Sequence, residues 1–290
     1  MKHISKITAI ALLATLSACE GSDMPIQQAD NHGYISFSAQ PQKTATRANP
    51  YEAYDPTRHP ATMGTFGYYD MPKRYASAAN TIFNNETATY NVATYGWDTA
   101  TKKRWTEYTK ASSFDFFAYM PYTGGATLLR TANNTYTLSF PFAMSDGGNH
   151  VPVIYDTKAA PIICAVPSSK GAITDSNGGG TVSLKFDQTL TGYKLLFMLG
   201  TKMNAIRHFR IKSVTLSGSF STSCTISRSY VWNTTSKSWS ASAITWSDIK
   251  RQSFVETPFP IAYKGYGSAD YDDNTQTVIV TSAGYTQWGA

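Results

Sequence analysis

Of all segments in this sequence, Phe114–Tyr122 places the strongest constraint on the fold. In an extended strand, successive side chains point to opposite faces. Apolar residues occupy both faces here, with Phe114, Phe116, Ala118 and Met120 on one side and Phe117 and Tyr119 on the other. We therefore expect a central strand of a sandwich, packed against protein on both sides. Pro121 has no N–H for a sheet ladder, so the strand should end there.

Similar short segments run through the rest of the chain, separated by Gly, Asn, Asp and Pro turns. Charged residues make up only 15% of the 290 residues, and 19 are tyrosine, a composition typical of β-structure. The predicted fold is all-β. The strands expected are Tyr34–Ala39, Met63–Tyr69, Thr87–Tyr95, Arg104–Lys110, Phe114–Tyr122, Thr135–Phe140, Thr181–Phe186, Tyr193–Leu199, Phe209–Leu216, Cys224–Trp232, Phe259–Tyr263 and Thr277–Thr281.

The length allows two domains, each with its own core. Pro152, Pro161 and Pro167 are followed by glycines at 171 and 178–180, and such a stretch is typical of an interdomain region. We interpret Gly178–Gly180 as a flexible linker, because a phosphate-binding loop would need a following Lys and Ser or Thr. The prediction is an N-terminal β-sandwich over 49–166 and a C-terminal one over 167–290.

The first 18 residues have the features of an export signal. Lys2 and Lys6 precede an apolar run, Ile7–Ala14, that is too short to span a membrane. The run leads to Leu16-Ser17-Ala18-Cys19, which resembles a bacterial lipobox, where cleavage before the cysteine is followed by acylation. Cys19 is thus the predicted lipidation site and outer-membrane anchor. The alternative is an ordinary secretory signal with a cysteine near its cleavage point.

A strand with one buried face is predicted soon after the signal. Ile35, Phe37 and Ala39 alternate with Ser36 and Ser38, so the apolar three should face inward. Residues 40–48 follow with Pro, small polar residues and Arg47, a composition typical of an exposed loop.

Signals for chemistry are weak. The five histidines are scattered, with no metal-ligand spacing, and no catalytic or nucleotide-binding motif is present. We therefore expect no catalytic residues, no metal and no cofactor. The formal charge of +6 includes two lysines of the predicted signal and forms no basic cluster, which argues against nucleic acid as a partner. Cys164 and Cys224 could form a disulfide in an oxidising compartment or remain buried thiols.

Taken in order, several of these segments resemble the Mfa-like fimbrillin family of Bacteroidetes. The resemblance rests on the lipobox with its acidic tether, Ile35-Ser36-Phe37, Thr46-Arg47-Ala48, Gly64–Tyr69, Phe114–Tyr122, Val182–Phe186 and Tyr193–Phe197. It implies two tandem transthyretin-like sandwiches in a surface fimbrial subunit, structural or adhesive, whose partners are other fimbrial subunits and a host ligand or glycan.

The resemblance also implies an assembly mechanism. A protease would cut after Arg47, the strand in residues 19–48 with Ile35, Phe37 and Ala39 would leave, and a neighbouring subunit's strand would replace it. The alternative is that residues 34–39 form a permanent edge strand. Family members carry further strands where this sequence reaches Gln287–Ala290, so the strand to be donated is expected to be missing, either by truncation or in a tip subunit.

A second function remains open, a surface glycan-binding lipoprotein. The six tryptophans, Trp97, Trp105, Trp232, Trp239, Trp246 and Trp288, could stack on sugar rings, although packing in the core is the more common role. An enzyme is the least favoured class.

Overall fold

The computed structural model describes residues 33–42, 51, 53–71, 78–143, 160–174, 178–190, 195–197, 209–211, 214–259, 271–272, 277–280 and 286–288. Across these ranges the regular secondary structure is β-strand apart from two short 3-10 helices, η1 (Ala78–Asn80) and η2 (Trp105–Tyr108). The all-β prediction is confirmed.

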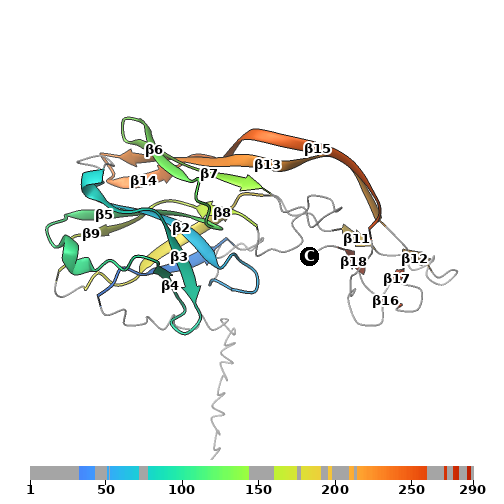
Figure 1. The fold of residues 1–290 in the computed structure, drawn as a ribbon, viewed down its shortest axis with the longest axis horizontal. Coiled ribbons are helices and arrows are strands. Elements are labelled where there is room, and N and C mark those ends of the chain that lie inside the picture. Colours follow the sequence, from blue (N-terminus) through green and yellow to red (C-terminus); the bar gives the residue numbers. More distant parts are fainter. Residues whose placement is uncertain are drawn as a thin grey trace, which may run out of the picture.

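The first sheet of the described chain contains eight strands and curves back on itself. They are β1 (Phe37–Pro41), β2 (Thr62–Tyr69), β3 (Thr81–Asn91), β4 (Gly96–Thr99), β5 (Ser113–Met120), β8 (Ile162–Cys164), β9 (Ser168–Gly171) and β10 (Val182–Gln188). Their order is β2-β3-β4-β1-β10-β8-β5-β9, and β2 also pairs with β5. That additional pairing closes the sheet into a barrel, visible around β2, β3 and β5 in Figure 1.

Strand β5 is the predicted central strand, and every residue from Phe114 to Met120 is buried. One face points into the barrel, where the Phe116 ring centroid lies 5.6 Å from that of Phe37. The other face supports the second sheet, where Tyr119 stacks on Phe140 at 4.5 Å. The strand ends at Met120, directly before Pro121, as the missing N–H predicts.

A second sheet packs over that outer face of β5. It contains β6 (Thr127–Ala132), β7 (Thr135–Ala143), β13 (Val214–Asn233), β14 (Ser238–Ala241) and β15 (Thr245–Phe259). Strand β13 is the common member, pairing with β7 along one edge and with β14 and β15 along the other. In β7, Tyr136, Leu138, Phe140 and Phe142 are buried and alternate with more exposed residues, as expected for a strand with one covered face.

Five short strands complete the described chain, at the far end of the β13–β15 ribbon (Figure 1). Strand β11 (Leu195–Phe197) pairs with β18 (Thr286–Trp288). Strand β17 (Thr277–Val280) pairs with β12 (Phe209–Ile211) and with β16 (Tyr271–Asp272).

The strand arrangement differs from the expected pair of tandem sandwiches. The predicted boundary at 166 and 167 falls between β8 and β9, which both pair with β5. Strands β10 and β13, which come after it, pair with β1 and β7, which come before it. Within the described ranges, both large sheets therefore contain strands from the two sides of that boundary. Pro161, Pro167, Gly171 and Gly178–Gly180 lie in or between strands of the barrel rather than in a linker, and Pro152 lies outside the described residues. Local composition carries no information on distant pairing.

Two local predictions are also corrected. Gly178–Gly180 forms a turn with positive φ at all three residues, and its second glycine lies against the indole of Trp105 so closely that a Cβ would meet the ring at 2.4 Å. The expected strand over Arg104–Lys110 is replaced by η2. The Glu107 side chain accepts a hydrogen bond from the Arg104 N–H at 2.9 Å, a capping contact that favours a helical turn.

Candidate strand-exchange site

The three residues predicted to plug the barrel are all buried. Ile35, Phe37 and Ala39 are 2%, 0% and 5% exposed. The Phe37 ring meets Phe83 and Phe116 edge to face, with centroid distances of 5.8 and 5.6 Å. Burying an isoleucine and a phenylalanine side chain contributes about 1.5–3 kcal/mol each, so this segment is a major part of the barrel core.

Strand β1 lies inside the sheet, between β10 and β4. It runs parallel to β10 in a continuous register from Phe37↔Val182 to Pro41↔Phe186. Beyond the strand, the Gln42 N–H donates to the Phe186 carbonyl at 2.8 Å. On the other side, β4 contributes one antiparallel pair, Phe37↔Trp97. At Phe37, β1 has a neighbour on each side, so the expectation of an edge strand is wrong there. That the strand is permanent stays a prediction.

The start of the segment is held by a second group of contacts, which we call the clasp: Gly33–Ile35 against Lys103–Trp105. The Ile35 N–H donates to the Lys103 carbonyl at 2.8 Å, and the Trp105 N–H donates to the Gly33 carbonyl at 2.9 Å. The Arg104 guanidinium donates to the Tyr34 hydroxyl at 2.8 Å and lies 4.6 Å from the centre of its ring. Neither Tyr34 nor Arg104 was singled out from the sequence, since they are 70 residues apart.

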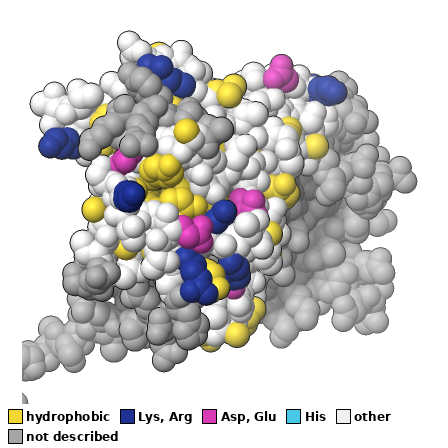
Figure 2. Space-filling view, turned by 60° about the vertical axis from the view of Figure 1, so that its left-hand side comes forward, with side chains coloured by type: hydrophobic (Ala, Val, Ile, Leu, Met, Phe, Trp, Pro, Cys, Tyr) yellow, Lys and Arg dark blue, Asp and Glu magenta, His cyan; other side chains and the backbone are white. Residues whose placement is uncertain are grey.

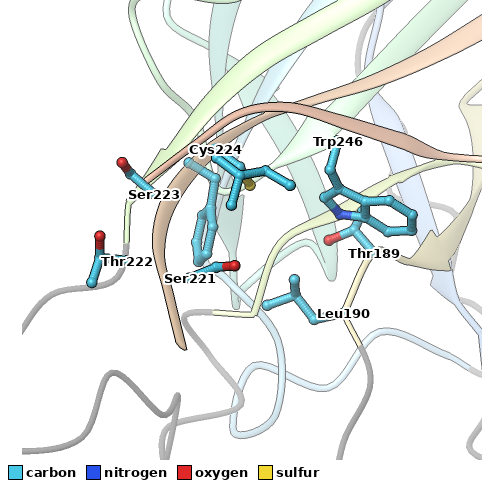
Figure 3. A pocket seen from close by; sticks show the side chains of 9 residues that line it. Thr189, Leu190, Ser221, Thr222, Ser223, Cys224 and Trp246 are labelled. Atoms are coloured by element: carbon cyan, nitrogen blue, oxygen red, sulfur yellow. The ribbon is translucent and has the colours of Figure 1, made fainter. Parts of the chain in front are cut away.

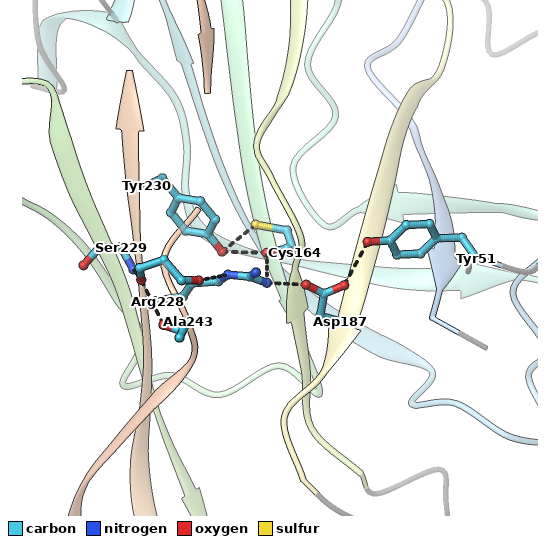
Figure 4. A network of polar contacts seen from close by, with 8 residues as sticks. Tyr51, Cys164, Asp187, Arg228, Ser229, Tyr230 and Ala243 are labelled. Carbon is cyan, nitrogen blue, oxygen red and sulfur yellow. Dashed lines mark hydrogen bonds and ion pairs between the residues drawn. The ribbon is translucent and has the colours of Figure 1, made fainter. Parts of the chain in front are cut away.

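The end of the segment is linked to the interface between the two sheets. Gln42 forms a bridge with Tyr51, whose hydroxyl donates to Asp187 at 2.9 Å. The other Asp187 oxygen accepts from Arg228 at 2.6 Å, so a residue of β10 is tied to a residue of β13 (Figure 4). Burial and the hydrogen bond to the Asp187 carboxylate raise the pKa of Tyr51 to about 12.

The same network includes a buried thiol. The Tyr230 hydroxyl donates to the Cys164 carbonyl at 2.8 Å and lies 2.9 Å from the Cys164 sulfur (Figure 4). Burial raises the pKa of the Cys164 thiol to about 11, and burial also raises the pKa of Tyr230. Both cysteines of the described chain are free thiols, so they are not paired here.

Two predicted site residues, Cys19 and Arg47, lie outside the described residues. Ile35, Phe37 and Ala39 are brought together with β10, which the sequence did not identify as their partner. In the part of the chain that the structure describes, no cluster of three His, Cys, Asp or Glu residues could hold a metal ion. Nor does any helix there have the length and apolar character needed to cross a membrane.

The tryptophans of the described residues differ in exposure. Trp97 and Trp105 are in the core at 1% exposed, whereas Trp246 is 46% exposed. Trp246 borders a pocket of about 290 Å³ between β13, β15 and the end of β10. Thr189 and Leu190 lie on the same side of this pocket, and Thr222 and Ser223 lie across from them (Figure 3). Its lining residues are apolar or carry hydroxyl groups.

The surface offers no single charged patch on the face shown in Figure 2, where basic side chains are interspersed with acidic and hydrophobic ones.

No family model and no curated protein matches the sequence. Among solved structures, the chain is similar to a crystal structure named "putative cell adhesion protein" from Bacteroides ovatus. The match covers 88% of this chain and 77% of that chain, with 11% sequence identity and a TM-score of 0.39. At that TM-score the likeness establishes no shared function.

Proposed function

We propose that this chain is a structural or adhesive subunit of a cell-surface fimbria. In this proposal β1 occupies the groove between β10 and β4, which we call the seat, and a strand of a neighbouring subunit later replaces it. The observation that carries the proposal is the position of β1: a short, early segment inserted inside the sheet, with Ile35, Phe37 and Ala39 buried. Its connection to the barrel runs through residues 43–50, which include Arg47.

Removing β1 would create a site that can bind an extended strand in two ways, through backbone hydrogen bonds and through apolar contacts. The backbone of β10 would lose its parallel partner along Val182–Phe186, leaving hydrogen-bonding groups for an incoming strand. The space left by Phe37 would expose the rings of Phe83 and Phe116 to water. An extended strand with alternating apolar residues satisfies both, which is the principle of strand addition.

In this proposal the subunit is exported, acylated at Cys19 and held at the outer membrane before assembly. Several acyl chains, at about 0.8 kcal/mol per buried CH₂, make such an anchor durable. The proposed partners are other fimbrial subunits, and no cofactor is required.

The test is cleavage followed by strand exchange on the full chain. Limited trypsin digestion should cut after Arg47, and a fluorescent peptide with the sequence of residues 33–42 should then bind the nicked chain while the original segment is lost. Because trypsin also cleaves after lysine, the matched control is the chain with both Lys43→Ala and Arg47→Ala, which should stay intact between residues 43 and 50 and exclude the peptide. The proposal fails if nicked protein retains residues 33–42 and excludes the peptide even in mild denaturant.

One observation favours a second function, binding of surface glycans. The exposed indole of Trp246 beside hydroxyl groups of the pocket is the combination of an apolar face and polar partners that a sugar ring can use. Affinity electrophoresis in gels containing host or plant polysaccharides should show retardation that Trp246→Ala abolishes. Tyr95→Ala, which removes another exposed aromatic ring, is the matched control. Equal mobility with and without polysaccharide would exclude this function for the sugars used.

A further inference from the structure

Three consecutive basic residues, Lys102-Lys103-Arg104, lie beside the start of the β1 segment. Lys102 and Arg104 are exposed and Lys103 is half-buried. Trypsin-like proteases cleave after lysine and arginine because their specificity pocket carries a carboxylate. By composition and exposure, residues 102–104 are therefore a cleavage site.

Two of the peptide bonds that such a protease would cut are engaged by residues 33–35, directly before β1. The carbonyl of the Lys103–Arg104 bond accepts the Ile35 N–H, at 2.8 Å. The nitrogen of the Arg104–Trp105 bond donates to the Gly33 carbonyl, at 2.9 Å. A protease must place the carbonyl oxygen in its own oxyanion hole and protonate the leaving nitrogen. Both bonds must therefore separate from residues 33–35 before they can react.

The side chain of Arg104 is engaged as well. Its guanidinium donates to the Tyr34 hydroxyl and lies over the Tyr34 ring, and a cation–π contact of this kind contributes about 0.5–1 kcal/mol at an exposed site. The arginine therefore has to leave Tyr34 in order to enter a specificity pocket. Backbone and side chain are shielded by the same short segment.

We propose that Lys102–Arg104 is a latent proteolytic site that residues 33–35, directly before β1, shield, and that it opens when these residues leave with β1 and nothing replaces them. The inference rests on the proposed function, in which β1 is a strand that departs. Its partner is an extracellular endopeptidase specific for basic residues. Water adds across the Arg104–Trp105 bond: the carbonyl carbon gains the hydroxyl, the nitrogen gains the proton, and the C–N bond breaks.

Cleavage of the Arg104–Trp105 bond would disrupt the structure around the seat. Trp105 packs edge to face on Phe114 at 5.2 Å, and its indole N–H donates to the Gly180 carbonyl at 3.1 Å. A break before Trp105 separates η2 from β4, which is the neighbour of β1. Subunits with an empty seat would therefore be cleaved and inactivated at the latent site. Subunits whose seat is filled by β1, or by a strand that also covers residues 103–105, would resist cleavage.

The first test needs no strand departure. Trypsin acts on two full chains that both carry Lys43→Ala and Arg47→Ala, one with Tyr34 and one with Tyr34→Ala. Mass spectrometry follows new amino termini at Arg104 and Trp105. Cleavage at Lys237–Ser238, in the exposed turn between β13 and β14, is the internal reference. Tyr34→Ala should raise cleavage at the clasp roughly tenfold relative to the reference, for loss of one cation–π contact and one hydrogen bond. Tyr95→Ala should leave the ratio unchanged.

The second test uses the chain nicked after Arg47. Cleavage at the clasp should rise as residues 33–42 are lost and should fall again when the synthetic peptide of residues 33–42 is added. If the nicked chain never releases that segment, the proposed function fails. The Tyr34→Ala comparison still tests whether residues 33–35 protect residues 102–104 from cleavage. Cleavage of the Lys43→Ala, Arg47→Ala chain at the clasp as fast as at Lys237–Ser238 would overturn the latent site.

Discussion

At the scale of single residues, Asp115 is the least expected feature of the molecule. It is 1% exposed in the middle of the aromatic strand β5. One carboxylate oxygen accepts from Ser169 at 2.6 Å and from the Trp239 indole N–H at 2.8 Å, while the other has no hydrogen-bond partner in the described chain. Burial raises the pKa of this carboxyl above its usual 3.8, despite the two donors. Asp115 thus joins β9 and β14 to β5, but its charged form is destabilised by burial.

This arrangement predicts a pH-dependent effect of Asp115→Asn. Because the folded-state pKa is raised, the wild-type carboxyl contributes most to stability below about pH 4 and loses that contribution as pH rises through the folded-state pKa. Asparagine keeps an oxygen for Ser169 and Trp239 and does not ionise. The variant should therefore gain stability relative to wild type between pH 4 and pH 7, measured by urea unfolding across that range.

The matched control is Asp248→Asn, which changes an exposed carboxylate. Its stability relative to wild type should vary little with pH over the same interval. A constant difference between Asp115→Asn and wild type from pH 3 to pH 7 would contradict the assigned cause.

At the scale of elements, the two faces of β1 differ in how deeply they are buried. Phe37 is fully buried against two aromatic rings, whereas Ser38 on the opposite face is only partly covered. A strand used only as an edge cap would not need so deep an anchor. The depth of Phe37 makes β1 a folding element, in addition to the removable role proposed for it above.

Phe37→Ala should accordingly destabilise the uncleaved chain by about 3–5 kcal/mol, the usual cost of deleting a buried phenylalanine side chain. Ser38→Ala, one residue along the same strand, should change stability by less than about 0.5 kcal/mol. Chemical denaturation of both variants gives the comparison. Equal effects of the two substitutions would show that β1 contributes little to the core.

At the scale of the whole molecule, the two large sheets are joined by aromatic packing and by one polar network. Phe117 of β5 meets Tyr230 and Trp239 of the second sheet at 5.3 and 5.5 Å. The salt bridge from Arg228 to Asp187 crosses between the same layers, with 11% and 21% of the two side chains exposed. Cys164 lies at this interface, hydrogen-bonded to Tyr230.

The thiols can therefore report separation of the sheets. In native protein at pH 8, Cys224, which is half-buried beside the pocket, should react with iodoacetamide well before Cys164. Cys164 is fully buried with a pKa near 11, so it should react only when the two layers separate. Peptide mapping after timed labelling distinguishes the two sites. Equal labelling rates in the absence of urea would contradict a closed interface.

Local sequence patterns determined several features of this protein. The all-β class, the burial of both faces of Phe114–Met120 and the inward direction of Ile35, Phe37 and Ala39 follow from alternation with a period of two. That period depends only on backbone geometry, so it can be read without knowing any distant contact.

Only the tertiary structure decided which segments meet. The parallel pairing of β1 with β10, the contact of Tyr34 with Arg104 and the sharing of both sheets across residue 166 join parts of the chain that are far apart in sequence. Alternation specifies the face that a side chain occupies but leaves the neighbouring strand open. The choice of neighbour came from closure of the barrel around its aromatic core, to which residues from Ile35 to Phe186 contribute.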